Sequence, residues 1–269
     1  MLWMDLTSER FPDAVKQADG LCLLPFGVIE RHGPHLPLGT DQIDVDAVAA
    51  AAAEVEPAVV FPPYIFGKIF TAQHYPGTIA LSRKLLMPLL EAVCDEIARN
   101  GFRKILIVNG HGGNRDPIAF FLRTLLDEPR EYTVYGTEYW ELDGEPAEQW
   151  AEMRDTDFGG HADEMETSLM LHVRPDLVHM EDLTGPEDGV ARGQAKHLAG
   201  IHHSLRWYAD HPTHYAGDAH TASAEKGKFL FDAMVEKLAR QMRTIKADEV
   251  VPELLQGFYE KSDHSDLLG

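Results

Sequence analysis

One short apolar run limits the possible folds of this chain more than any other stretch. Residues 104–108 (KILIV) pass directly into a glycine-rich loop, residues 109–114 (NGHGGN), and Asp116-Pro117 can then begin a helix that extends to about Leu126. An uninterrupted apolar strand is typical of a parallel sheet that is covered on both faces. Strand, loop and helix in this order place His111 at the carboxyl end of the strand, where open α/β sheets bind their ligands.

The rest of the chain alternates between strand and helix patterns. Pro88 is expected to delay the regular part of the helix that contains it, and the acidic tail from Glu253 is expected to be partly ordered at best. The alternation predicts an α/β protein, a three-layer α/β/α sandwich with a mostly parallel central sheet, in one domain over residues 1–269. The other predicted strands cover 21–29, 59–61 and 132–135, and the other predicted helices cover 13–17, 41–56, 82–100, 161–173 and 221–247.

Charge and cysteine usage narrow the class of protein. The chain has 24 basic and 44 acidic residues and a formal charge of −20, which argues against nucleic acid or an anionic membrane as a partner, since both attract a basic face. Cys22 and Cys94 lack the spacing of a disulfide framework or a thiolate zinc site. The sequence shows neither a signal peptide nor a membrane-spanning apolar run, so we expect a cytoplasmic protein.

A second stretch collects side chains that bind metals. Residues 30–41 (ERHGPHLPLGTD) follow the first predicted strand and lead into an alanine-rich helix. Glu30 and His32 are two residues apart, so they point to the same side if the extended geometry persists. The intervening glycines and prolines favour a tight loop that can return Asp41 to them. Carboxylate and imidazole together suit a divalent cation; a surface loop with ordinary charges is the alternative.

A third group of polar side chains begins the helix predicted from residue 161. Its first turn holds His161, Asp163, Glu164 and Glu166, although acidic residues there are also explained by their interaction with the helix dipole. The histidines of the irregular segment 176–220 show no metal-binding spacing on a clear helix. We interpret them as solvated or interface residues: His179, His197, His202, His203, His211, His214 and His220.

Two poorly patterned segments are candidates for substrate contacts. Residues 64–81 contain the sequence HYPGT at 74–78, and long loops of this kind inside compact domains are often functional. The polar segment 138–157, with Trp140 and Trp150, is expected to pass over the site or into a subunit interface.

Taken together, three of these stretches resemble the creatininase (creatinine amidohydrolase) family. The resemblance rests on residues 30–41, 109–114 and 161–168 (HADEMETS), with weaker support from 74–78 and 222–227 (ASAEKG). It implies a metal-dependent hydrolase that cleaves a non-peptide or unusual amide C–N bond in a small molecule. It also implies two divalent metal ions per chain (Zn, Mn or Fe) and assembly as a homohexamer.

The resemblance further implies a role for the metal-ligand candidates. Glu30 and His111 would hold one ion, His32 would hold the other, and Asp41 would bridge the two. Two such cations can activate a water molecule and polarise an amide carbonyl. The ligand types do not distinguish Zn, Mn and Fe.

The family pattern is incomplete at the second ion. In creatininase itself a carboxylate lies in the histidine-glycine loop, where this sequence has Gly113. We expect Glu164 to replace it, with Glu166 as the reserve candidate. His161 matches the family's catalytic histidine and is expected to protonate the departing nitrogen.

A further departure affects the substrate. Creatininase carries a tryptophan over its substrate four residues before the catalytic histidine, where this chain has Asp157. We therefore favour a relative with another substrate, similar to the branch that includes formamidopyrimidine deformylases and the peptide-trimming member of mycofactocin maturation. The alternatives are creatininase proper, a non-catalytic metal-binding or assembly protein on the same scaffold, and a phosphate-binding module that uses the Gly112-Gly113 loop.

Overall fold

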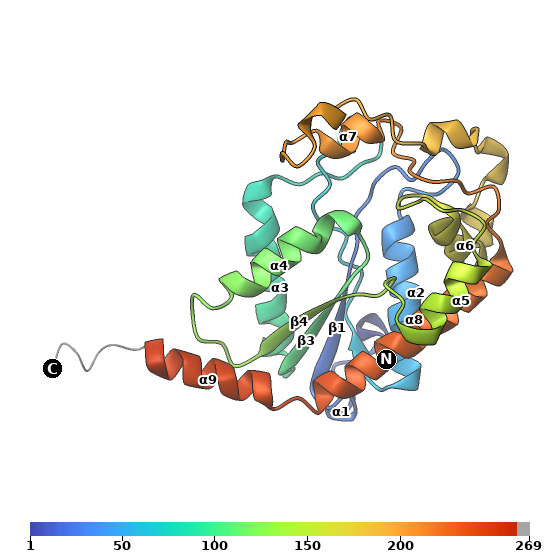
Figure 1. Ribbon diagram of the computed structural model, residues 1–269. Coiled ribbons are helices and arrows are strands. Elements are labelled where there is room, and N and C mark those ends of the chain that lie inside the picture. Colours follow the sequence, from blue (N-terminus) through green and yellow to red (C-terminus); the bar gives the residue numbers. More distant parts are fainter. Residues whose placement is uncertain (263–269) are drawn as a thin grey trace.

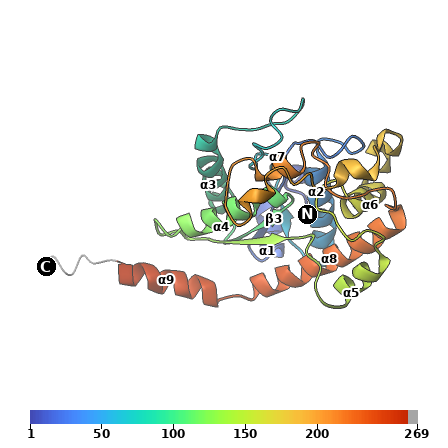
Figure 2. The same ribbon diagram turned by 45° about the horizontal axis from the view of Figure 1, so that its top comes forward.

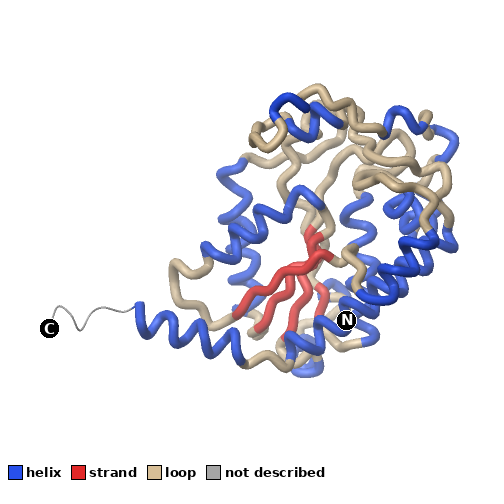
Figure 3. Tube along the Cα trace, viewed as in Figure 1, coloured by secondary structure: helices blue, strands red, loops and turns tan. Residues whose placement is uncertain are grey.

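The computed structural model describes residues 1–262, and within them a four-stranded sheet forms the centre of the fold. Its strands are β1 (Leu21–Phe26), β2 (Val59–Val60), β3 (Lys104–Asn109) and β4 (Thr133–Glu138), in the order β2-β1-β3-β4. Each neighbouring pair is parallel. The structure thus confirms the α/β fold and the parallel sheet expected from the apolar runs (Figure 3).

Helices cover both faces of the sheet, because side chains alternate along each strand. Leu23 and Leu106 contribute to one core, and Leu24 and Ile107 contribute to the core on the opposite face. The first core is completed by α2 (Thr40–Val55), α5 (Gly144–Met153), α6 (Glu164–Val173) and α8 (Ala224–Lys246), and the second by α1 (Phe11–Gln17), α3 (Arg83–Arg99) and α4 (Arg115–Thr124) (Figure 1).

One local expectation was wrong. Pro88 lies inside α3, whose regular part begins at Arg83, because a proline so near the start of a helix removes one hydrogen bond while Ser82 caps the first turn. The first part of the acidic tail, from Glu253, lies in α9 (Val250–Ser262), which extends away from the body beyond α8 (Figure 2). Residues 263–269 lie outside the described part of the chain. Within residues 1–262, no helix has the length and apolar character needed to cross a membrane.

The order of the strands determines where a site can form. The connection after β1 runs through α2 on one face, and the chain continues from β3 into α4 on the other face. The carboxyl ends of β1 and β3 therefore flank a switch point of the kind at which open α/β sheets bind ligands. The long loops and α7 (Arg206–Asp210) gather over this end of the sheet (Figures 1 and 3).

Close packing of two helices fixes α6 beside this switch point. Gly227 of α8 lies against the backbone of Ser168 in α6, so close that an added Cβ would stand 1.8 Å from the Ser168 carbonyl oxygen. The segment 222–227, which gave weak support to the resemblance, therefore has a packing role: it allows α8 to approach the helix that carries site residues.

Candidate metal centre

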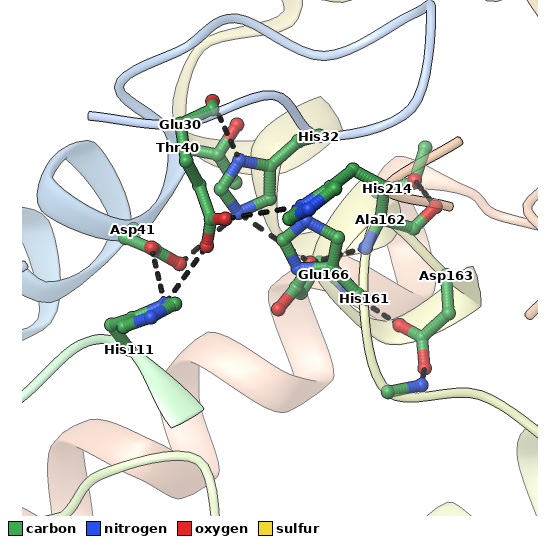
Figure 4. A network of polar contacts seen from close by, with 12 residues as sticks. Glu30, His32, Thr40, Asp41, His111, His161, Ala162, Asp163, Glu166 and His214 are labelled. Atoms are coloured by element: carbon green, nitrogen blue, oxygen red, sulfur yellow. Dashed lines mark hydrogen bonds and ion pairs between the residues drawn. The ribbon is translucent and has the colours of Figure 1, made fainter. Parts of the chain in front are cut away.

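Three predicted ligands meet between the ends of β1 and β3. Nδ1 of His111 lies 2.9 Å from Oε1 of Glu30 and 3.0 Å from Oδ2 of Asp41 (Figure 4). All three side chains are buried, yet neither of these oxygens makes a hydrogen bond of good geometry within residues 1–262. Buried oxygens without partners are costly, whereas a cation between them would satisfy both. Their ligand atoms all lie within 4.8 Å of one another, as one divalent ion requires.

A second group shares Asp41 with the first. Nδ1 of His32 donates to the carbonyl oxygen of Glu30 over 3.2 Å, so Nε2 is the nitrogen that can coordinate an ion once its proton is lost. That nitrogen lies 3.1 Å from Oδ1 of Asp41 and 3.9 Å from Oε2 of Glu166. Asp41 thus offers one carboxylate oxygen to each group, which is the geometry of a bridging ligand.

The start of α6 holds Glu166 in this second group. Asp163 is the N-cap residue, and its Oδ1 accepts hydrogen bonds from the backbone N–H groups of Met165 (3.0 Å) and Glu166 (3.1 Å). The Glu166 carboxylate in turn accepts from the N–H of Ala162. This is a variant of the capping box, in which an acidic residue in the first turn reaches back to the residues before the helix. One helix-capping motif therefore also orients a ligand-type carboxylate.

The structure does not bring Glu164 to the cluster. Each residue advances about 100° around an α-helix, so Glu164 and Glu166 face nearly opposite directions. The Glu164 carboxylate accepts hydrogen bonds from the N–H groups of Asp155 and Thr156, each at 3.0 Å, and forms an ion pair with Lys226. This placement corrects our expectation for Glu164, since its side chain anchors the 155–156 loop, and the reserve candidate Glu166 takes the position beside His32.

Glu164→Ala is expected to lower the free energy of unfolding by about 3 kcal/mol, because removing one member of a buried ion pair leaves its partners unsatisfied. Urea denaturation measures the change. Glu225→Ala, which removes an exposed carboxylate at the start of α8, is the control and should change stability by less than about 0.5 kcal/mol. Equal effects of the two substitutions would contradict the anchoring role of Glu164.

His161 stands beside the cluster with a defined tautomer. Its Nε2 lies 2.8 Å from the carbonyl oxygen of Arg31, so Nε2 carries the proton and donates it. Its ring centroid lies 4.2 Å from that of His32. Burial and the neighbouring His32 lower the pKa of His161 to about 4. At neutral pH the ring is therefore uncharged, and its Nδ1 can accept a proton before it donates one.

The sequence analysis missed His214, and its interpretation as a solvated or interface residue was wrong. His214 is fully buried, with Nδ1 3.3 Å from Oε2 of Glu30. The backbone carbonyl groups of His214 and of the two residues before it bind this segment to two others that are distant in the sequence, which no local pattern could show. The contacts that hold the segment are Gly33 N–H to His214 O (2.7 Å), Arg31 Nε to Thr213 O (2.9 Å) and Tyr75 Oη to Pro212 O (2.7 Å).

Asp44 was also missed, although its spacing could have revealed it. It follows Asp41 by three residues on α2, which places the two side chains on neighbouring parts of one helix face. Asp44 is buried, lines the same cavity as Asp41, and its Oδ1 has no hydrogen-bond partner within residues 1–262. Burial and the nearby Glu166 raise the pKa of Asp44 well above its usual value.

The cluster opens into a cavity of about 520 Å³. Two tryptophans from elsewhere in the chain lie in its wall: Trp140, which follows β4, and Trp207 of α7. The ring of Trp207 stands edge-on to that of His161, with 5.8 Å between the ring centroids. The cavity therefore has aromatic walls despite Asp157. Its lining also includes Lys68, Thr71, Gly112, Gly113, Arg115, Asp163 and Met165.

The basicity of the two ligand-type histidines gives a prediction on pH. Burial alone would lower the pKa values of His32 and His111, but Asp41 beside the former and Glu30 beside the latter raise each to about 10. Both rings are therefore protonated at pH 7 and must lose a proton to coordinate an ion. Burial also raises the pKa of Glu166 to about 8, so this carboxyl group is largely protonated at pH 7 as well. Titration of the protein with Zn²⁺ at pH 7 is therefore expected to release about three protons, and the affinity is expected to rise with pH up to about 10. Calorimetry in buffers of different ionisation enthalpy counts the protons, and binding without proton release would contradict these protonation states.

Comparisons with known proteins define the family of this chain. The family model of creatinine amidohydrolase matches residues 4–242. The mycofactocin precursor peptide peptidase of Mycolicibacterium smegmatis is 30% identical over 85% of this chain and 86% of its own length. Creatinine amidohydrolase of Pseudomonas putida is 28% identical over 89% of this chain and 95% of its own length. A crystal structure of creatininase superposes with a TM-score of 0.75 at 26% identity, covering 92% of this chain and 98% of that chain.

These matches show a hydrolase scaffold of the α/β class, and the structure adds side-chain groups at its switch point that could hold a metal ion. The chain belongs to the creatininase (creatinine amidohydrolase) family, which confirms the resemblance seen in the sequence motifs. Solved creatininase structures include a Zn-Zn form and a Mn form.

Proposed function

We propose that this protein is a metal-dependent amidohydrolase that cleaves an amide, formamide or cyclic amide C–N bond in a small molecule. The observation that carries the proposal is the pair of ligand groups that share Asp41 and open into a cavity of about 520 Å³. The named functions of its relatives, peptidase and creatinine amidohydrolase, are both hydrolyses of C–N bonds.

The donor set supports two divalent ions per chain. We propose Glu30, Asp41 and His111 as ligands of one ion and His32, Asp41 and Glu166 as ligands of the other. Mixed carboxylate and imidazole ligands suit Zn, Mn and Fe. When bound, two such ions supply Lewis acidity and lower the pKa of water.

The protein's own residues supply the proton transfers and the shape of the site. His161 lines the cavity with its Nε2 fixed on a backbone carbonyl, so we assign its Nδ1 to accept the proton of the attacking water. The resulting imidazolium can then protonate the departing nitrogen, which is the acid step expected for this residue. The buried walls exclude bulk water and strengthen these electrostatic effects.

Elemental analysis of paired variants tests the ligand set. Glu166→Gln is expected to reduce the metal content from two ions per chain to one, because its carboxylate stands beside His32. Glu164→Gln is the matched control on the same helix turn and is expected to retain both ions. Loss of metal from the control and not from Glu166→Gln would reverse the assignment.

A turnover assay separates the enzyme from a metal-binding or assembly protein. A panel of formamides, cyclic amides and short peptides would be offered to protein loaded with Zn or Mn, with a chelated sample as the control. Hydrolysis that disappears with chelation and returns with metal supports the proposal. If the protein shows no turnover and binds one ion per chain with no open coordination position, the non-catalytic alternative is favoured.

Two finer points of the proposal concern assembly and location. We propose a homohexamer, as the family resemblance implies, which analytical ultracentrifugation would test. We also propose a cytoplasmic location, because Cys22 and Cys94 are both free and buried, as expected of thiols in a reducing compartment.

A further inference from the structure

One lysine in the cavity wall differs from the other partly or fully buried lysines of the described chain. Lys68 is partly buried and lines the cavity, yet its ammonium group has no carboxylate or carbonyl partner within residues 1–262. The other partly or fully buried lysines all have such partners there: Lys104, Lys226, Lys237 and Lys246. A cation in a cavity wall that no neighbouring carboxylate compensates is available to an anionic ligand.

The backbone around Lys68 is fixed beside the metal-ligand cluster. Its N–H donates over 2.9 Å to Oδ1 of Asn114, a fully buried residue that ends the glycine-rich loop. Gly67 permits this approach, because a Cβ there would stand 2.6 Å from the Asn114 side chain. The carbonyl oxygen of Lys68 packs closely against Gly113, because a Cβ added at Gly113 would stand only 3.3 Å from this oxygen. Lys68 is therefore attached to the loop that carries His111.

The other cation in the cavity wall is already engaged. Arg115 forms an ion pair with Glu141, and its guanidinium group lies 5.5 Å from the ring centroid of Trp140. Its role is to hold the tryptophan in the wall. Lys68 is thus the cavity cation whose charge is not compensated by a neighbouring side chain.

The surrounding charge makes this lysine informative about the substrate. The chain carries a formal charge of −20, and several carboxylates face the same cavity, so the protein's overall field does not attract an anion. We propose that Lys68 binds a carboxylate of the substrate, and that the substrate is therefore an anionic amide whose acid group occupies the same cavity as the scissile bond. This inference rests on the proposed function, since it concerns the molecule that this site cleaves.

Binding of metal-directed probes tests the inference without turnover. Succinic, glutaric and adipic monohydroxamates each carry a metal-binding group and a carboxylate, and alkyl hydroxamates of matching length lack the carboxylate. Calorimetry on the Zn-loaded protein is expected to show that at least one acid binds about tenfold more tightly than its alkyl counterpart, as one charge-assisted hydrogen bond allows.

Variants assign the preference to one side chain. Lys68→Met should abolish the preference for the acid, Lys68→Arg should retain part of it, and Lys84→Met, which removes an exposed lysine at the start of α3, should leave it unchanged. All variants should keep the metal content of the wild type. A preference that survives in Lys68→Met, or equal binding of acid and alkyl probes to the wild type, overturns the inference while leaving the proposed function intact. If no hydroxamate binds the Zn-loaded protein, the proposed metal centre fails and the inference fails with it.

Discussion

Asp41→Ala is expected to weaken metal binding at both positions at once. Asp41 presents Oδ1 to His32 and Oδ2 to His111, so removal of its carboxylate takes a ligand from each group. Loss of ligand-supporting groups alone typically costs 10–100-fold in affinity, so loss of a shared ligand should cost about 100-fold or more per ion. Elemental analysis after dialysis, together with competition against a chelator, measures the change.

The control for this variant lies on the same helix. Asp46 of α2 hydrogen-bonds to Gln42 and does not line the cavity, so Asp46→Ala should retain both ions. Circular dichroism would establish that both variants are folded. If Asp41→Ala retains its full metal content, Asp41 does not bridge the two positions.

His161→Gln is expected to lower kcat by about 10²–10⁴-fold while the metal content stays the same. Glutamine keeps an N–H donor for the carbonyl of Arg31 but cannot accept and return a proton at neutral pH. Steady-state kinetics with any amide that the wild-type protein hydrolyses measures the effect.

His179→Gln is the control for the loss of an imidazole, because the His179 side chain is exposed and is not part of the cavity lining. It should leave kcat within about twofold of the wild-type value. A His161→Gln protein with wild-type turnover would exclude His161 as the proton-transfer residue. A variant that also loses metal would instead indicate that His161 helps to hold an ion.

The sequence predicted the elements whose signals are local. The apolar run before the glycine-rich loop has one reasonable structure, a covered parallel strand, and β3 occupies it together with Asn109. Likewise, the tight loop between Glu30 and Asp41 was expected from its glycines and prolines, and the structure brings both residues to His111. In each case neighbouring residues in the chain determine the geometry.

The failures concern residues whose positions depend on distant contacts. The sequence gives no reason to prefer Glu164 or Glu166 as the ligand. The orientation of α6 relative to the cluster decides: it turns Glu164 toward Lys226 and Glu166 toward His32. His214 resembles its neighbouring histidines, but its burial depends on hydrogen bonds to segments more than a hundred residues away, such as that of Arg31 with Thr213. Local patterns carry no information on such contacts.

The first turn of α6 connects the candidate metal centre to a second loop of the chain. On one side Glu164 fastens the 155–156 loop, and on the other Glu166 faces His32, so the two carboxylates lie on opposite sides of one turn. Asp163 caps this turn through the N–H groups of Met165 and Glu166. The position of the loop and the position of the ligand-type carboxylate therefore depend on the same few capping hydrogen bonds, although the two groups serve different purposes.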